Sequence, residues 1–153
     1  MHPHTNGTTS HAAHQDSDQT HPAYPLAENA AESLAAANGR PLAAVTLEAA
    51  AQGALSADDI RISAATLRAQ ADIARQAGYT ALAQNLARAA ELTAVPDAEL
   101  LRMYEQLRPG RAGEAELVAL AERLEHDFDA PMTAAFVREA TAVYRRRNLL
   151  RRD

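Results

Sequence analysis

The chain has 153 residues, with 20 acidic side chains against 15 basic ones and a formal net charge of −5. This length predicts one domain and excludes a self-contained β/α barrel, which needs roughly 250 residues. The net acidity argues against nucleic-acid binding, the short apolar runs argue against a membrane span, and the absence of cysteine excludes disulfides, thiolate metal sites and a cysteine nucleophile.

The first segment, residues 1–22, contains no Leu, Ile, Val or Phe. A segment that buries no apolar surface does not offset its ordering entropy, so we expect a disordered tail. The segment also lacks the apolar region of a secretory signal. Its five imidazoles lack the folded frame that a zinc site needs, although two of them, His11 and His14, would share one face of a helix. The histidines of the tail are His2, His4, His11, His14 and His21.

Residues 23–62 are expected to be irregular and helical in short pieces. A thin apolar stripe at Leu26, Ala30 and Leu34 predicts a short helix that Gly39 ends. Two later helix starts are predicted from hydroxyl side chains at N-cap positions. These are Thr46, before a helix over residues 47–52 that stops at Gly53, and Ser56, which Asp59 follows three residues later.

Two helices joined by a tight turn are predicted next. Ser63 is the expected N-cap of a helix that runs to Ala77 and stops at Gly78, and Thr80 is the expected N-cap of the second. The side chains expected to face inward are Leu67, Ala71 and Ala74 on the first helix, and Leu82, Leu86 and Ala89 on the second.

Three further helices follow, each with apolar residues at helical spacing. One starts at Pro96 and closes at Arg108-Pro109-Gly110, one follows Gly113, and one begins near Pro131. Their inward stripes are Leu100, Met103, Tyr104 and Leu107; Leu117, Leu120, Ala121 and Leu124; and Phe136, Val137, Ala140, Val143 and Tyr144.

No segment alternates β-branched and polar residues as a strand would. The predicted fold class is therefore all-α: an open up-and-down helical bundle over residues 63–153, preceded by the irregular part over residues 23–62 and the disordered tail. Residues 23–153 are expected to form one domain. Because alanine is abundant and aromatic residues are few, the core is expected to be thin, and a partner would supply the missing burial.

One histidine lies outside the tail, and it is the first candidate for acid–base chemistry. His126 stands beside carboxylates near the expected end of a helix, where a cation commonly stabilises the helix end. We therefore expect a structural role for it, and a solvated face for the neighbouring acids. These acids are Glu114, Glu116, Glu122 and Glu125.

Arginine supplies every basic side chain, and it gathers at the end of the sequence. The cluster favours a solvated helix end whose cations complement the helix dipole, with a protein partner as the alternative. DNA reading by the helix pair over residues 67–92 is disfavoured, because no basic stripe accompanies the outward polar side chains. The cluster is Arg145, Arg146, Arg147, Arg151 and Arg152, and the outward side chains are Gln84, Asn85 and Arg88.

Several runs of residues carry a resemblance to a known family. Residues 59–111, and within them the run RAAELTAVPD over residues 88–97, resemble the small (gamma) subunit of adenosylcobalamin-dependent diol and glycerol dehydratases. Four other runs fit the same pattern, so that the resemblance covers residues 24–153. They are YPLAE over residues 24–28, GRPL over 39–42, TLE over 46–48, and AAFVREATAVYRRR over 134–147.

The resemblance implies a subunit of a larger enzyme, a dimer of large–medium–small heterotrimers. That enzyme converts 1,2-propanediol to propionaldehyde, or glycerol to 3-hydroxypropionaldehyde, with loss of water. The resemblance also implies that the radical chemistry lies in a barrel of the large (alpha) subunit, and that adenosylcobalamin is bound between the large and medium (beta) subunits. No catalytic, cofactor-binding or metal-ligating residue is then expected on the present chain, which would pack mainly on the large subunit.

The expected location is cytoplasmic, with enclosure in a bacterial microcompartment as the alternative. Packaging through residues 1–22 is not expected, because this segment has no apolar face. A second hypothesis keeps the fold without the enzyme and makes the chain a freestanding helical adaptor. Purification with two larger chains and a corrinoid would support the dehydratase subunit, and purification as a lone monomer would support the adaptor.

Overall fold

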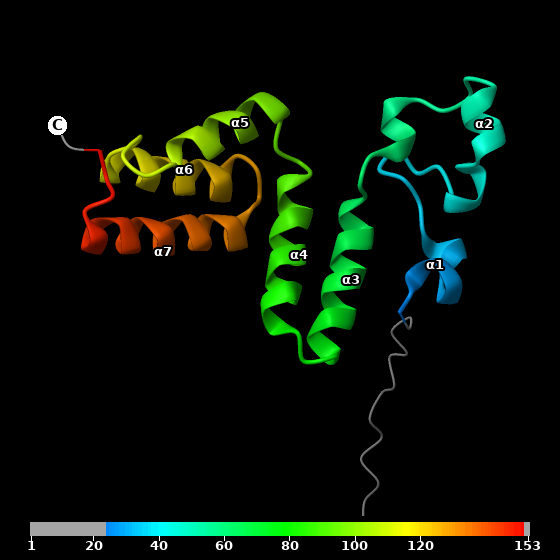
Figure 1. Cartoon of the computed structure of the whole chain (residues 1–153), viewed down its shortest axis with the longest axis horizontal. Helices are drawn as coiled ribbons and strands as arrows, with labels where there is room; N and C mark the ends of the chain where they lie inside the picture. Colours follow the sequence, from blue (N-terminus) through cyan, green and yellow to red (C-terminus); the bar gives the residue numbers. More distant parts are fainter. Residues whose placement is uncertain (1–23, 152–153) are drawn as a thin grey trace, which may run out of the picture.

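The computed structural model describes residues 24–151, and every regular element in that part of the chain is a helix (Figure 1). Among these residues extended backbone pairs only at an isolated bridge between Ala35 and Pro41. The predicted all-α fold class is confirmed. None of the described helices is long and apolar enough to cross a membrane. The tail predicted over residues 1–22 lies outside the described residues, as does Arg152.

Residues 24–62, here called the N-terminal segment, contain two short α-helices and three single turns of 3-10 helix. The predicted helix through Leu34 is wrong, because it ends after one turn and Leu34 itself is extended. The Ser33 hydroxyl donates to the Ala30 carbonyl oxygen at 2.8 Å, a local bond that competes with helix continuation. The elements are α1 (Leu26–Asn29), α2 (Leu47–Ala51) and the 3-10 turns Ala31–Ser33, Leu42–Ala44 and Ala57–Ile60.

Three of the predicted N-caps are confirmed. The Thr46 hydroxyl accepts a hydrogen bond from the Ala49 N–H at 3.1 Å, and Ser63 accepts one from the Thr66 N–H at 3.5 Å. Ser56 caps the third 3-10 turn in a reciprocal arrangement with a carboxylate three residues on. Short polar side chains at these positions satisfy N–H groups that the first helical turn leaves without a partner.

The predicted helical hairpin consists of α3 (Ala64–Gln76) and α4 (Thr80–Leu92), which lie antiparallel in Figure 1. The turn between them contains Gly78 at φ +82°, a backbone conformation that favours glycine. The prediction that Thr80 is the N-cap of α4 is wrong by one residue. Tyr79 holds that position, without a capping hydrogen bond from its side chain.

The buried residues of this hairpin are alanines rather than leucines. Small side chains let two helices approach closely, so the narrow space between α3 and α4 is filled by methyl groups. The prediction that Leu82 and Leu86 face the core is wrong, because Leu82 is 50% exposed and Leu86 is only partly buried. The side chains of this alanine seam are Ala71, Ala74, Ala83 and Ala90.

The hydrophobic core lies among α5 (Asp97–Gln106), α6 (Glu114–His126) and α7 (Pro131–Arg147). The predicted stripe of α6 is confirmed, since all four of its members are buried. Tyr104 and Phe136 were predicted to face inward, and this is wrong: both are exposed, Tyr104 to 59%. The buried core residues are Val95, Met103, Ala112, Leu117, Leu120, Ala121, Leu124, Ala130, Ala134 and Val137.

Two antiparallel pairs, α3–α4 and α6–α7, lie crosswise to each other in Figure 1, and α4 meets α7 where they join. The Glu91 carboxylate of α4 caps the start of α7: it accepts from the Met132 N–H at 2.9 Å, the Thr133 N–H at 2.8 Å and the Thr133 hydroxyl at 2.6 Å. Ala130, at the N-cap of α7, has no side-chain acceptor, so a residue from another helix performs that role. Because the two pairs meet chiefly where α4 contacts α7, the bundle is open. The N-terminal segment lies beside α3, on the side away from α7.

Candidate interaction surface

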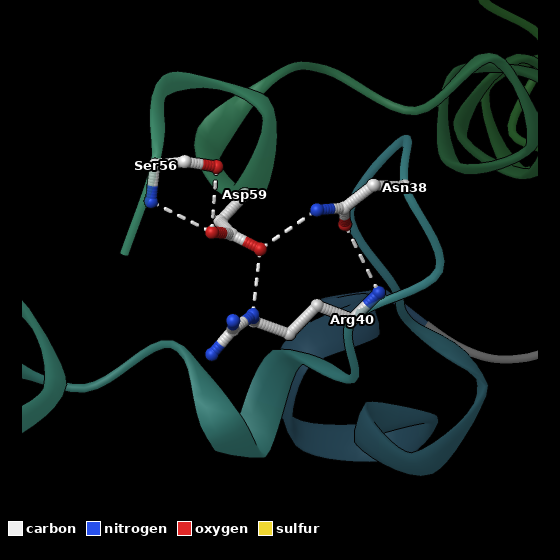
Figure 2. Close-up of polar contacts among 4 residues, drawn as sticks. All are labelled: Asn38, Arg40, Ser56 and Asp59. Carbon is white, nitrogen blue, oxygen red and sulfur yellow. Dashed lines mark hydrogen bonds and ion pairs between the residues drawn. The ribbon is translucent and has the colours of Figure 1, made fainter. Parts of the chain in front are cut away.

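Asp59 is a buried carboxylate of the N-terminal segment that accepts four hydrogen bonds (Figure 2). Its side chain is only 3% exposed. One carboxylate oxygen accepts from the Asn38 amide at 2.7 Å and the Arg40 Nε–H at 2.6 Å. The other accepts from the Ser56 N–H at 2.7 Å and the Ser56 hydroxyl at 2.8 Å. The Asn38 amide and then the Ser56 N–H hold the pKa of Asp59 well below its ordinary value of 3.8.

This arrangement ties together parts of the N-terminal segment that share few other contacts. Asn38 and Arg40 lie on the turn between the bridged residues, whereas Ser56 and Asp59 lie at the last 3-10 turn. The capping pair of Ser56 and Asp59 was predicted from the sequence. The two partners from residues 38 and 40 were missed, because nothing local in the sequence indicates a pairing over 19 to 21 residues.

Replacing Asp59 with asparagine is expected to speed amide hydrogen exchange across residues 34–62 at pH 7. The carboxylate is stabilised in the folded state, so its contribution is complete above the ordinary pKa of 3.8 and declines as the pH falls below about 4. The difference between wild type and variant, compared at equal pH, should therefore shrink in acid. Asp58→Asn is the matched control, since the exposed Asp58 contacts only Arg61, at 3.6 Å. Equal exchange in wild type and Asp59→Asn at pH 7 would contradict the role given to this group.

The acids of α6 that were expected to be a solvated face are partly engaged with arginines of the last helix and the residues after it. These pairs join α6 to α7 and to Arg151, which follows α7. The Gly113 N–H, at 2.7 Å, and Arg151 also lower the pKa of Glu116. The pairs are Glu114 with Arg145 at 2.9 Å, Glu116 with Arg151 at 3.0 Å, and Glu125 with Arg138.

His126 is the last residue of α6 and is exposed. Its place near the helix end agrees with the expectation of a structural position. Glu122 is exposed as well. Over residues 24–151, no three His, Asp or Glu side chains are grouped so that they would hold a metal ion. The five histidines predicted to lie in the tail are outside that range.

The arginine cluster divides into residues that pair and residues that remain in solvent. Arg145 and Arg151 reach the acids of α6, whereas Arg146 and Arg147 are exposed in the last turn of α7. That position favours cations through the helix dipole. Two arginines of the cluster therefore help to hold α6 against the C-terminal part of the chain.

The outward polar side chains of α4 are also partly engaged within the molecule. Arg88 donates to the side-chain oxygen of Asn85, and its guanidinium lies 4.4 Å from the centre of the Phe136 ring. A stacked arginine of this kind is attracted to the face of the ring. Gln84 is exposed, but α4 offers no row of free cations for phosphates.

Three grooves with shared lining residues lie beside α3 and at the connection from α4 to α5. The first, of about 420 Å³, lies between Tyr24 and the hairpin and is lined by Leu82 and Leu86. The second, of about 500 Å³, lies between the N-terminal segment and α3. The third, of about 520 Å³, lies at the connection from α4 to α5. Gln70 lines the first two grooves, and Ile62 lines the last two.

Large apolar side chains remain exposed along these three grooves, which together are here called the apolar strip. This surface was not predicted from the sequence, because the leucines of α4 were assigned to the core and the isoleucines at the third 3-10 turn and after it were not singled out. The exposed members are Tyr24, Leu42, Ile60, Ile62, Tyr79 and Leu82.

Comparison with known proteins identifies the family of this chain. Residues 19–151 match the family described as "Dehydratase small subunit". The chain is 47% identical over 130 residues to a propanediol dehydratase small subunit of Citrobacter freundii, an alignment that covers 85% of this chain and 76% of the relative. It is 46% identical over 130 residues to the propanediol dehydratase small subunit of Salmonella typhimurium, covering 85% and 75%. The match extends over both helix pairs and the N-terminal segment, and the chain belongs to the dehydratase small-subunit family.

Proposed function

We propose that this chain is the small, non-catalytic subunit of a coenzyme B12-dependent diol or glycerol dehydratase, in which it packs on and stabilises the large subunit. The observation that carries the proposal is the similarity to propanediol dehydratase small subunits over 85% of the chain. The proposed reactions are the conversion of 1,2-propanediol to propionaldehyde and water, and of glycerol to 3-hydroxypropionaldehyde and water. The proposed complex is a cytoplasmic dimer of large–medium–small heterotrimers.

The chemistry of the described side chains supports a structural role. The acids of α6 that approach arginines serve to join helices, and His126 stands apart in solvent at a helix end. The three grooves of the apolar strip are lined largely by aliphatic and small residues, and no imidazole lines any of them. Such surfaces do not suit a corrinoid or a reacting diol, which need polar groups to orient them. We therefore assign adenosylcobalamin and the reacting substrate to the large and medium subunits.

Co-expression with and without this chain tests the proposal. The large and medium dehydratase subunits of the same organism would be purified in both cases and compared for size, bound corrinoid and turnover of 1,2-propanediol and glycerol. We expect the present chain to co-purify, and its omission to reduce the yield of full-size complex. A full-size, fully active complex formed by the two larger subunits alone would refute the stabilising role. A chain that elutes alone, as a monomer, would support the freestanding adaptor instead.

A further inference from the structure

We propose that the apolar strip is the face on which this subunit docks, and that its occupant is an uncharged, apolar segment of one of the larger dehydratase subunits. The inference rests on the proposed function, since it assumes the larger subunits as partners, but it adds the surface and the chemistry of the contact. Surfaces of this kind, apolar and continuous, are typical of interfaces.

Continuity distinguishes the strip from other exposed apolar side chains. Its three grooves share lining residues, so that exposed Leu82 and Ile62 lie on one continuous surface. By contrast, Leu101 on α5 is followed by Arg102, which pairs with Glu99 at 2.9 Å. Phe136 on α7 is covered by a guanidinium from α4. Each of these two residues has an exposed apolar neighbour one helical turn away, Tyr104 for Leu101 and Met132 for Phe136, but all four lie outside the three grooves of the strip.

Charge at the strip indicates what kind of segment would bind there. In the first two grooves the charged lining residues, Asp59 and Arg61, already pair within the chain, so these grooves present no unbalanced charge to a partner. Asp97 lines only the third groove, at the start of α5. A charged segment would lose its hydration without gaining an opposite charge, whereas an apolar segment would lose nothing of this kind. The internal pairs are Asp59 with Arg40 at 2.6 Å and Arg61 with Asp58 at 3.6 Å.

The chain's own first residues do not have the composition to fill the strip. Tyr24, where the described part begins, lines the first groove. Residues 1–22 contain no Leu, Ile, Val or Phe, and they offer almost no apolar area to bury. The occupant therefore belongs to another chain.

The place of the second groove gives docking a further consequence. This groove is bounded on one side by the N-terminal segment, through Leu42 and Ile60, and on the other by α3, through Leu67. A segment bound there contacts both sides at once and joins two parts of the molecule that pack weakly on each other. Docking is therefore expected to slow amide exchange in residues 34–62 as well as to bury the strip.

The test compares Ile62→Asp with Leu101→Asp in the complete complex. The two side chains are similarly exposed, at 65% and 71%, but only Ile62 lies in the strip. We expect Ile62→Asp to reduce co-purification with the larger subunits at least tenfold, and Leu101→Asp to leave it within twofold of wild type. Leu82→Asp, in the first groove, is a second variant and should also reduce it. Circular dichroism of each isolated variant should match wild type, because these positions are exposed.

The outcomes separate the two proposals. If wild type co-purifies but Ile62→Asp and Leu82→Asp behave like Leu101→Asp, the docking face is wrong while the proposed function stands. If wild type itself does not co-purify, the proposed function fails and the docking assignment fails with it. If light scattering shows a homodimer of the isolated chain that Ile62→Asp dissociates, and co-purification persists in that variant, the occupant is a second copy. If Ile62→Asp abolishes binding of the larger subunits but Ile62→Lys binds them like wild type, the partner segment is acidic. That result would refute the proposal that the segment is uncharged.

Discussion

Replacing Leu117 with alanine is expected to lower the free energy of unfolding by about 3 kcal/mol, within the range typical of leucine-to-alanine changes in well-packed cores. Leu117 has no exposed surface and belongs to the cluster that joins α5, α6 and α7. The substitution removes three carbon atoms and leaves a cavity that neighbouring side chains fill only in part. Urea denaturation followed by circular dichroism at 222 nm measures the change.

The control for this prediction is Leu101→Ala, at an exposed position on the neighbouring helix. Exposed apolar side chains contribute little to folding, so a change within about 0.5 kcal/mol is expected. The core assignment would be refuted if the two variants lost similar stability. A loss confined to Leu117→Ala would locate the stabilising burial at the interface of α6 with its neighbours.

Removing the Glu91 carboxylate is the second large perturbation. Glu91→Ala is expected to cost about 2 kcal/mol, because the Met132 and Thr133 N–H groups and the Thr133 hydroxyl all lose their acceptor. Thr133 is buried, so water does not readily replace the lost bonds. Amide exchange at residues 131–134 should rise more than elsewhere in α7, and a proton–deuterium exchange experiment with proteolytic fragments would resolve this.

Two further variants give the Glu91 prediction its controls. Glu91→Gln keeps a side-chain oxygen of the same reach and should retain part of the lost stability, whereas Glu122→Ala removes an exposed acid and should cost little. If Glu91→Ala leaves both stability and exchange unchanged, the joint between α4 and α7 rests on other contacts.

Helix α6 shows how far periodicity alone predicts this fold. Its four stripe residues recur at three- and four-residue spacing and are all buried. Helix α4 has an equally regular leucine stripe, yet its alanines face α3 and Leu82 remains exposed. A periodic apolar pattern predicts which face of a helix will be buried. It does not predict whether that face is buried by the same chain or by a partner. For a subunit, the more apolar face can be reserved for a partner.

Contacts between residues distant in sequence account for the rest of what was missed. Thr46, Ser56 and Ser63 were predicted as caps because each bonds a residue only three positions on. Thr46 and Ser63 accept from a backbone N–H there, and the Ser56 N–H donates to the Asp59 carboxylate. Glu91 reaches groups 41 and 42 residues away, and no local pattern marks it. One sequence signal was present, since Pro131 begins a helix whose preceding residue, Ala130, offers no side-chain acceptor. A helix start of this type calls for an acceptor from elsewhere.

The candidate surface was predicted only in outline. The abundance of alanine indicated a thin core and hence a partner, but it did not indicate where the partner binds. The second groove arises because the N-terminal segment lies beside α3, and Asp59 together with Asn38 and Arg40 holds two parts of that segment together (Figure 2). Such a three-way contact depends on the tertiary structure and leaves no spacing in the sequence to detect.

The alanine seam between α3 and α4 also has a thermal consequence. The heat-capacity change and much of the enthalpy absorbed on unfolding scale with the apolar surface that becomes exposed, and the methyl groups of alanine expose little of it. In the isolated chain the α3–α4 hairpin should therefore melt over a broad temperature range, and its free energy of unfolding should curve only weakly with temperature. The core of α5, α6 and α7, which contains leucines, should melt sharply. A partner bound on the face of α4 that carries Leu82 and Leu86 would add buried apolar surface and give the hairpin the cooperative transition that its alanine seam lacks.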